Sequence, residues 1–259
     1  EYRLRKTRVT LTMSVSVFDP EFKDLPEVIP VFPLTGVLLL PGATLPLNIF
    51  EPRYLAMIDA AMASGRLIGM VQPQQPDEHD NQGGNPAAEE PDGDADSTTT
   101  AATNGPALYD TGCVGRIVQF EETEDGRYII VIKGLSRFRI EKEMPLDHGG
   151  FRKVRADWSP FANDLEQLAD DPSELLDRDR LIPSLRQYFE LHGLSADWDA
   201  IERTPDDRLV MTLCMICPFA PGEKQALLEA PDLSARADIM QALIAMAAHE
   251  NDDAAAIRH

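Results

Sequence analysis

The stretch that decides how the chain folds is IPVFPLTGVLLLPGATLPLNIFEPRYLAMIDAAMASG, residues 29–65. Its prolines lack a backbone N–H donor, so they favour strand starts, edge positions and bulges. Pro41-Gly42 predicts a turn between strands at Val37–Leu40 and Leu45–Phe50. Pro52 predicts the start of a helix, because the first helical N–H has no intrahelical partner. Helical spacing gives this helix one apolar face, made of Tyr54, Leu55, Ile58 and Met62.

Further short strands are predicted beyond this stretch, with one hairpin turn at Glu124-Asp125-Gly126. Asp-Gly favours such a turn because glycine adopts positive φ without strain. Several short strands with little helix between them favour a closed or semi-closed antiparallel β barrel. The predicted strands are Leu67–Val71, Gly112–Glu122, Arg127–Lys133, Arg137–Glu143 and Phe151–Trp158.

Composition divides the chain into parts. We predict a disordered N-terminal extension at residues 1–24, a β-barrel subdomain at 25–159, a helical subdomain at 160–250 and a tail at 251–259. Residues 72–106 form a predicted disordered acidic loop within the barrel part, because apolar residues are too sparse there to offset the entropy of ordering. In the helical part, Thr204-Pro205-Asp206-Asp207 predicts a capped helix start, and Pro183 predicts a kink or a break.

Charge and cysteine content restrict the class of protein. The chain has 259 residues and a net charge of −20, which repels nucleic acid and anionic membranes at long range. Residues 107–158 are locally neutral, however, so this restriction is weak for a local basic site. No apolar run reaches the length of a membrane span. Three cysteines suit a reducing compartment without disulfides, and we expect a cytoplasmic protein.

No motif in the sequence nominates a catalytic residue, a metal site or a cofactor. Cys214 and Cys217 form a lone CxxC at the end of an apolar helix, whereas a structural zinc needs four ligands. We interpret these thiols as packing residues, with metal binding and redox chemistry as alternatives. The GxxxxGK[ST] phosphate loop is absent, so ATP hydrolysis through that motif is not expected.

Four segments in this order resemble the substrate-binding (N-terminal) domain of Lon proteases. They are PVFPL to NIFEPRY followed by a helix, Gly115-Arg116-Ile117-Val118, Ile132-Lys133-Gly134 with Arg137-Phe138, and Pro218-Phe219 through Glu229. The resemblance covers most of residues 25–248. It implies an α+β fold: a PUA-like antiparallel β barrel with one inserted helix, followed by a C-terminal helical subdomain. The chain looks like a free-standing version of that domain, without the phosphate loop and the Ser–Lys protease segment of full-length Lon enzymes, so we expect no enzymatic activity.

The resemblance implies a non-enzymatic module that binds unfolded or tagged polypeptide, as an adaptor or regulator in protein quality control. A separate protease is a further candidate partner. A Pro-interrupted strand edge could accept an extended peptide by strand addition. The candidate peptide-binding residues are Phe32, Leu34, Phe50, Glu51, Arg53, Tyr54, Arg116, Lys133, Gly134 and Arg137.

Three alternatives remain open from the sequence. Arg53 could be a structural ion-pair partner of Glu51 rather than a peptide ligand. The PUA-like barrel could bind RNA through Lys133, Arg137 and the basic residues near Arg152, although alternation along strands disperses these side chains and we do not expect nucleic acid as the partner. A metal-dependent hydrolase that uses the cysteines is the third reading.

Overall fold

The computed structural model describes residues 19–74, 105–165 and 176–256. It is a mixed α+β structure with one six-stranded sheet, which confirms the predicted class. The strands are β1 Val28–Pro33, β2 Thr44–Ile49, β3 Leu67–Val71, β4 Thr111–Glu122, β5 Tyr128–Glu143 and β6 Arg152–Asp157. The α-helices are α1 Pro52–Met62, α2 Arg178–Leu191, α3 Trp198–Arg203, α4 Asp206–Ile216, α5 Pro221–Glu229 and α6 Leu233–Ala256, with 3₁₀ turns η1 Phe22–Asp24 and η3 Ser159–Asp164.

The sheet closes on itself through β5. Strand order is β2-β5-β4-β3-β1-β6, and β5 also pairs with β6, so the pairing returns to β5. β1 and β3 pair in parallel, which makes the prediction of a purely antiparallel arrangement wrong at this position. Parallel neighbours need a long crossover, and β2 with α1 supplies it between β1 and β3.

The two strands predicted at 127–133 and 137–143 are one continuous strand, β5. Its first half pairs with β2 and its second half with β6. Between the halves the register with β4 shifts, since Val114 pairs with Ser136 and Gly115 with Gly134. This bulge bends β5 and lets one strand serve two neighbours. The predicted hairpin turn is confirmed, with Gly126 at φ +77°.

The strand predicted at Val37–Leu40 is wrong. These residues are irregular, although Leu38, Leu39 and Leu40 are buried, and the first strand is Val28–Pro33 instead. The two prolines of β1 are tolerated because each lies at a position where β1 pairs with only one neighbouring strand. Pro30 pairs with Lys153 on β6, and Pro33 pairs with Val71 on β3.

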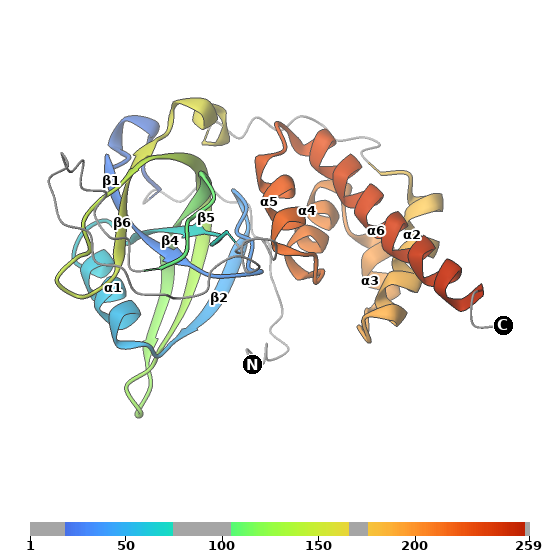
Figure 1. Cartoon of the computed structure of the whole chain (residues 1–259), viewed down its shortest axis with the longest axis horizontal. Helices are drawn as coiled ribbons and strands as arrows, with labels where there is room; N and C mark the ends of the chain where they lie inside the picture. Colours follow the sequence, from blue (N-terminus) through green and yellow to red (C-terminus); the bar gives the residue numbers. More distant parts are fainter. Residues whose placement is uncertain (1–18, 75–104, 166–175, 257–259) are drawn as a thin grey trace, which may run out of the picture.

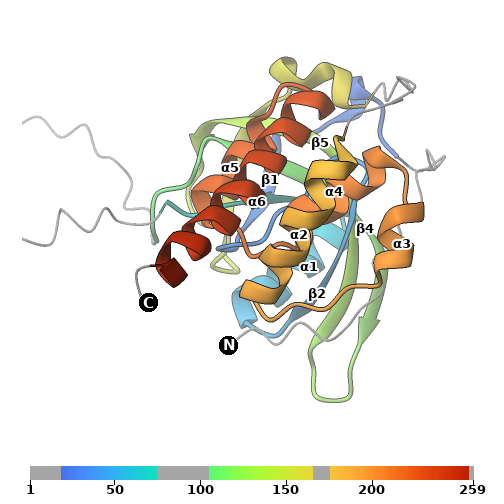
Figure 2. The ribbon, with the colours of Figure 1, turned by 90° about the vertical axis from the view of Figure 1, so that its right-hand side faces the viewer.

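Helices α2 to α6 gather beside the sheet, with α5 against β4 and with α6 packed on α2 and α4, whereas α1 lies apart from them against β1 and β3 (Figures 1 and 2). One hydrophobic cluster contains residues from the sheet, α1 and the later helices, so the two predicted subdomains share a core. Polar contacts join them as well. Lys224 Nζ donates to the Gly36 carbonyl at 2.7 Å, and Gln72 Nε2 donates to the Pro221 carbonyl at 3.0 Å.

Other sequence predictions have mixed outcomes. The helix start at Asp206 is confirmed. α2 continues through Pro183 without a break, although this proline has no N–H to donate to the Asp179 carbonyl. The structure describes residues 19–24, within the predicted extension, and Asp19 makes ion pairs there. In the predicted acidic loop only residues 72–74 and 105–106 are described, and Pro73 bridges to Leu108; the rest of it, like residues 1–18, lies outside the described residues.

Candidate functional site

The loop Met144–Phe151, between β5 and β6, separates two hollows on the surface, and we call it the β5–β6 loop. Its backbone is well bonded: the Asp147 N–H donates to the Phe151 carbonyl at 3.0 Å, and the Gly150 N–H donates to the Asp147 carbonyl at 2.8 Å. Gly150 has φ +79°, which glycine adopts without strain. These two hydrogen bonds close a turn within the loop.

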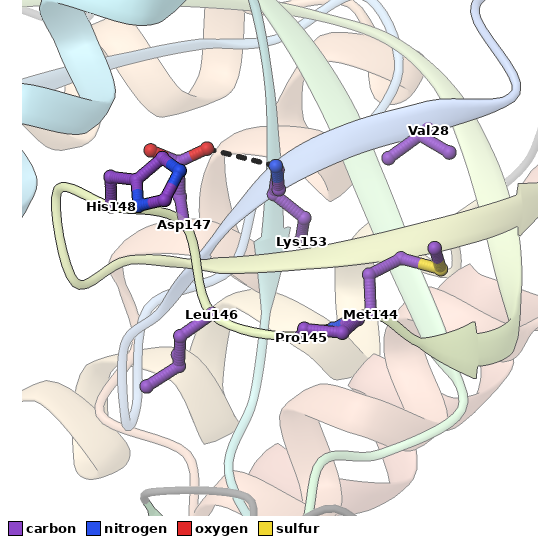
Figure 3. Close-up of a pocket in the computed structure, with 7 residues that line it drawn as sticks. All are labelled: Val28, Met144, Pro145, Leu146, Asp147, His148 and Lys153. Atoms are coloured by element: carbon purple, nitrogen blue, oxygen red, sulfur yellow. Dashed lines mark hydrogen bonds and ion pairs between the residues drawn. The ribbon is translucent and has the colours of Figure 1, made fainter.

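The first hollow, drawn in Figure 3, has a volume of about 270 Å³. Its apolar end holds Val28 and Met144, and its polar end holds His148 and the ion pair between Asp147 and Lys153 (Figure 3). The lining is Val28, Met144, Pro145, Leu146, Asp147, His148 and Lys153.

The second hollow lies on the other side of Leu146 and has a volume of about 200 Å³. The N-terminal turn of α1 forms one wall, with Arg53 and Tyr54, and Phe151 and Arg152 form another. The remaining lining residues are Pro33, Pro73, Gly105, Pro106, Leu146 and Gly150. Leu146 lines both hollows and is 38% exposed, so the two hollows share this apolar side chain.

We call the two hollows and the β5–β6 loop together the loop surface. Its charged groups pair with one another. Arg53 donates to Glu51 at 2.8 Å and lies over the ring of Tyr54, 4.7 Å from its centroid. The hydrogen bond to Glu51 raises the pKa of Arg53. The hydrogen bond from Lys153 and then that from the Gly149 N–H lower the pKa of Asp147. Arg152 is buried and donates to Glu143 and the Pro106 carbonyl.

Of the predicted residues around α1, Arg53 and Tyr54 line the second hollow, whereas Phe32, Leu34, Phe50 and Glu51 belong to neither lining. Phe32 is buried behind Tyr54, with ring centroids 4.2 Å apart, so it supports the site rather than facing solvent. Leu34 is half-buried. Phe50, at the entrance to α1, is 51% exposed.

Arg116 and Lys133 form a separate group on β4 and β5. Both pair with the carboxylate of Asp19, at 2.9 and 2.8 Å. Among the described residues neither of them lines the two hollows of the loop surface.

Arg137 and Gly134 lie in the framework of the fold. Arg137 is buried, and each of its guanidinium nitrogens donates to Asp164 or to the carbonyls at the end of α5. At Gly134 a Cβ would stand 2.1 Å from the Leu40 carbonyl oxygen, so the strand needs glycine for close packing. We therefore assign both to structure and remove them from the proposed peptide surface.

Of the six basic residues that the RNA hypothesis rests on, all but Arg139 form an ion pair with a carboxylate of the described residues. Lys133 pairs with Asp19, and Arg137 with Asp164; the ion pairs of β6 are Arg152–Glu143, Lys153–Asp147 and Arg155–Glu27. Such pairing lowers the local positive charge that phosphate contacts require.

The three cysteines are buried free thiols, and burial raises the pKa of Cys214 and of Cys217 to about 12. Within residues 19–74, 105–165 and 176–256 no group of His, Cys, Asp and Glu could hold a metal ion. In the same ranges, none of the helices combines the length and apolar character needed to cross a bilayer.

Sequence reasoning missed Leu146, Phe151 and the prolines that line the second hollow. The signal was an apolar Pro145-Leu146 pair directly before the turn-forming residues Asp147–Gly150. Apolar residues beside a turn are often exposed, because a turn carries the chain across the surface.

Comparison with known proteins gives consistent matches. The family model of the ATP-dependent protease La (LON) substrate-binding domain matches residues 28–245. Lon protease 2 of Myxococcus xanthus is 27% identical over 225 residues, which are 86% of this chain and 24% of that protein. The Lon protease of Syntrophus aciditrophicus is 27% identical over 222 residues, 84% of this chain and 25% of that protein.

The matched region thus spans about a quarter of the length of these curated relatives. Among solved structures, the Lon N-terminal domain protein from Xanthomonas campestris has 21% identity and a TM-score of 0.48, over 83% of this chain and 97% of that one.

Proposed function

Because this chain belongs to the ATP-dependent protease La (LON) substrate-binding domain family, we propose that it binds unfolded or tagged polypeptide through the loop surface. The family supports the general role of a substrate-binding module, and we place its contact with polypeptide at the loop surface. The observation that carries this placement is Leu146, an exposed leucine held between two hollows by a well-bonded loop.

The size of the hollows favours a polypeptide over a small molecule. Pockets for drug-sized ligands occupy about 300–1,000 Å³, whereas these hollows are about 270 and 200 Å³. Each suits one or two amino-acid side chains, and together they suit an extended chain that crosses Leu146. Apolar contact would contribute about 25 cal/mol per Å² buried.

The charged groups of the loop surface pair with one another, so they would orient a bound polypeptide more than they would attract it by net charge. Arg53 is 51% exposed at its side chain and already pairs with Glu51, so its guanidinium keeps donors for peptide carbonyls at the rim. Phe50 adds an exposed ring at the entrance to the same helix. A polypeptide would thus contact apolar surface first and polar groups at its edge, as in other protein interfaces.

Three finer points belong to the same proposal. The closed pairing circuit through β5 supports a PUA-like barrel. The match to a substrate-binding domain supports a role as an adaptor or regulator in protein quality control, for which we propose no enzymatic activity and a separate protease as a partner. The buried free thiols support a reducing, cytoplasmic location.

Fluorescence anisotropy tests this function directly. A labelled, permanently unfolded polypeptide and a labelled single-stranded RNA are each titrated with the protein at two salt concentrations. We expect saturable polypeptide binding that depends weakly on salt. RNA binding that falls steeply with salt would support the RNA reading instead, and binding of neither probe would contradict the proposal.

A further inference from the structure

Arg116 on β4 and Lys133 on β5 are direct partners in the antiparallel register. Directly opposed residues put their side chains on the same face of a sheet, and like charges in this position are destabilising. Both side chains are also largely buried, at 12% and 13% exposure, which weakens screening by solvent. Two cations placed in this way form a site for an anion.

Asp19 occupies that site from a distant part of the chain. Its Oδ1 accepts from Arg116 Nε at 3.0 Å and from Arg116 Nη2 at 2.9 Å, and its Oδ2 accepts from Lys133 Nζ at 2.8 Å. Each carboxylate oxygen therefore has a charged donor, and such charge-assisted bonds are about twice as strong as neutral ones. The geometry is that of a bound carboxylate.

Residues 21–24, just after Asp19, add little packing to this contact, whereas Pro20 is half-buried and Leu25 packs on a hydrophobic cluster. The four residues 21–24 are exposed, including the ring of Phe22 at 42%. Glu21 and Lys23 pair with each other at the surface, at 73% side-chain exposure each, and not with the sheet. Exchange of the Asp19 carboxylate for another one thus disturbs few apolar contacts at residues 21–24.

We propose that Arg116 and Lys133 form a carboxylate-binding site for acidic polypeptide, and that Asp19 occupies this site in cis as a competing occupant. The site takes an Asp or Glu side chain or a C-terminal carboxylate. The inference rests on the proposed polypeptide binding and adds a preference for acidic segments, which Asp19 reduces by its high effective concentration.

Three short labelled peptides of one apolar sequence test the site. One carries a single Asp and an amidated C-terminus, one has Asn in that place, and one has Asn with a free C-terminal carboxylate. In Asp19→Asn, we expect about tenfold tighter binding of the Asp peptide, the magnitude typical of one charge-assisted contact released from competition. The Asn amide peptide should bind as it does to the unchanged protein. Tightening of the third peptide as well would identify chain ends as ligands.

Glu21→Gln is the matched control, because it removes the same charge from the same segment without touching the site. It should leave the Asp-to-Asn affinity ratio within about twofold. Lys133→Met, which leaves Asp19 paired with Arg116, should reduce that ratio to one and serves as the test if Asp19→Asn fails to fold. A ratio unchanged in both Asp19→Asn and Lys133→Met would overturn the carboxylate site.

Failure of the proposed function looks different, since then no peptide binds any variant. In that case N-acetylaspartate is titrated into the unchanged protein while the side-chain NMR signals of Arg116 and Lys133 are followed. Saturable shifts that Glu21→Gln retains and Asp19→Asn strengthens would uphold the site alone, and their absence would overturn it.

Discussion

Arg137 and Asp164 form a bidentate ion pair that ties β5 to η3, with Nε to Oδ2 at 2.9 Å and Nη2 to Oδ1 at 2.8 Å. The same guanidinium donates from Nη1 to the Ala230 carbonyl at 2.6 Å, just beyond the end of α5. One buried side chain therefore joins the sheet, the turn that follows β6 and the helical part. These contacts account for an arginine at position 137, in the framework of the fold rather than at the loop surface.

Arg137→Met should destabilise the fold strongly. The change leaves the Asp164 carboxylate, 10% exposed, without its partner, and breaking a buried pair in this way costs about 3–5 kcal/mol. Urea denaturation followed by circular dichroism should show a lower midpoint with an unchanged slope. Arg53→Ala, which breaks the exposed pair with Glu51, should cost about 1 kcal/mol or less. Equal losses in the two variants would contradict the structural assignment of Arg137.

Gly134→Ala should also destabilise the fold, by about 1–3 kcal/mol or more. The added Cβ would meet the Leu40 carbonyl oxygen at 2.1 Å, and backbone atoms cannot move aside as a flexible side chain can. Gly65→Ala is the control, because its Cβ would meet only Leu67 Cγ at 4.0 Å. Thermal melting of both variants distinguishes close packing from a general effect of losing glycine; a neutral Gly134→Ala would show that this approach is not needed.

The β5–β6 loop should respond to pH through Asp147. Its pKa is lowered from the ordinary value of 3.8, first by the hydrogen bond from Lys153 and then by that from the Gly149 N–H. The ionised form is favoured in the folded state, so this contribution to stability is present above pH 3.8 and is lost as pH falls through the lower folded pKa. NMR titration of the Gly149 amide should give a midpoint below 3.8.

Lys153→Met provides the control for that titration. Removal of the largest cause should move the midpoint of the Gly149 amide upward, toward 3.8, while the backbone bond remains. A midpoint that is the same in both proteins would show that Lys153 does not set the charge state of the loop.

The thiols should be inert in the folded protein. Burial raises the pKa of Cys214 and of Cys217 to about 12, and it raises that of Cys113 further. At pH 8 the reactive thiolate is therefore scarce. Ellman's reagent should modify the native chain slowly and all three cysteines rapidly in denaturant. Rapid reaction of Cys214 or Cys217 in the native state would favour the redox or metal reading.

Local signals in the sequence predicted much of the fold. The hairpin at Gly126 and the start of α4 at Asp206 were predictable because turn and cap preferences depend on adjacent residues. The strand at Val37–Leu40 was wrong because a short apolar run does not distinguish a strand from a buried irregular segment. In the structure residues 37–40 are an irregular segment whose Leu40 carbonyl lies against Gly134.

The candidate site was less predictable, because its geometry depends on contacts between distant residues. Arg137 and Arg53 look alike in sequence, yet one meets Asp164 in the interior and the other meets Glu51 at the surface. The alternative that Arg53 is an ion-pair partner of Glu51 agrees with the structure, although its contact with peptide stays a prediction. Leu146 belongs to the site because it shares one hollow with Val28 of β1 and the other with Arg53 and Tyr54 of α1.

The most direct test of the central proposal compares Leu146→Glu with Leu191→Glu. Both leucines are exposed, at 38% and 44%, so neither change should unfold the chain, but Leu191 ends α2, away from the loop surface. In anisotropy titrations with unfolded polypeptide, we expect Leu146→Glu to weaken binding at least tenfold and Leu191→Glu to bind as the unchanged protein does. Equal affinities of both variants and the unchanged protein would contradict polypeptide binding at the loop surface.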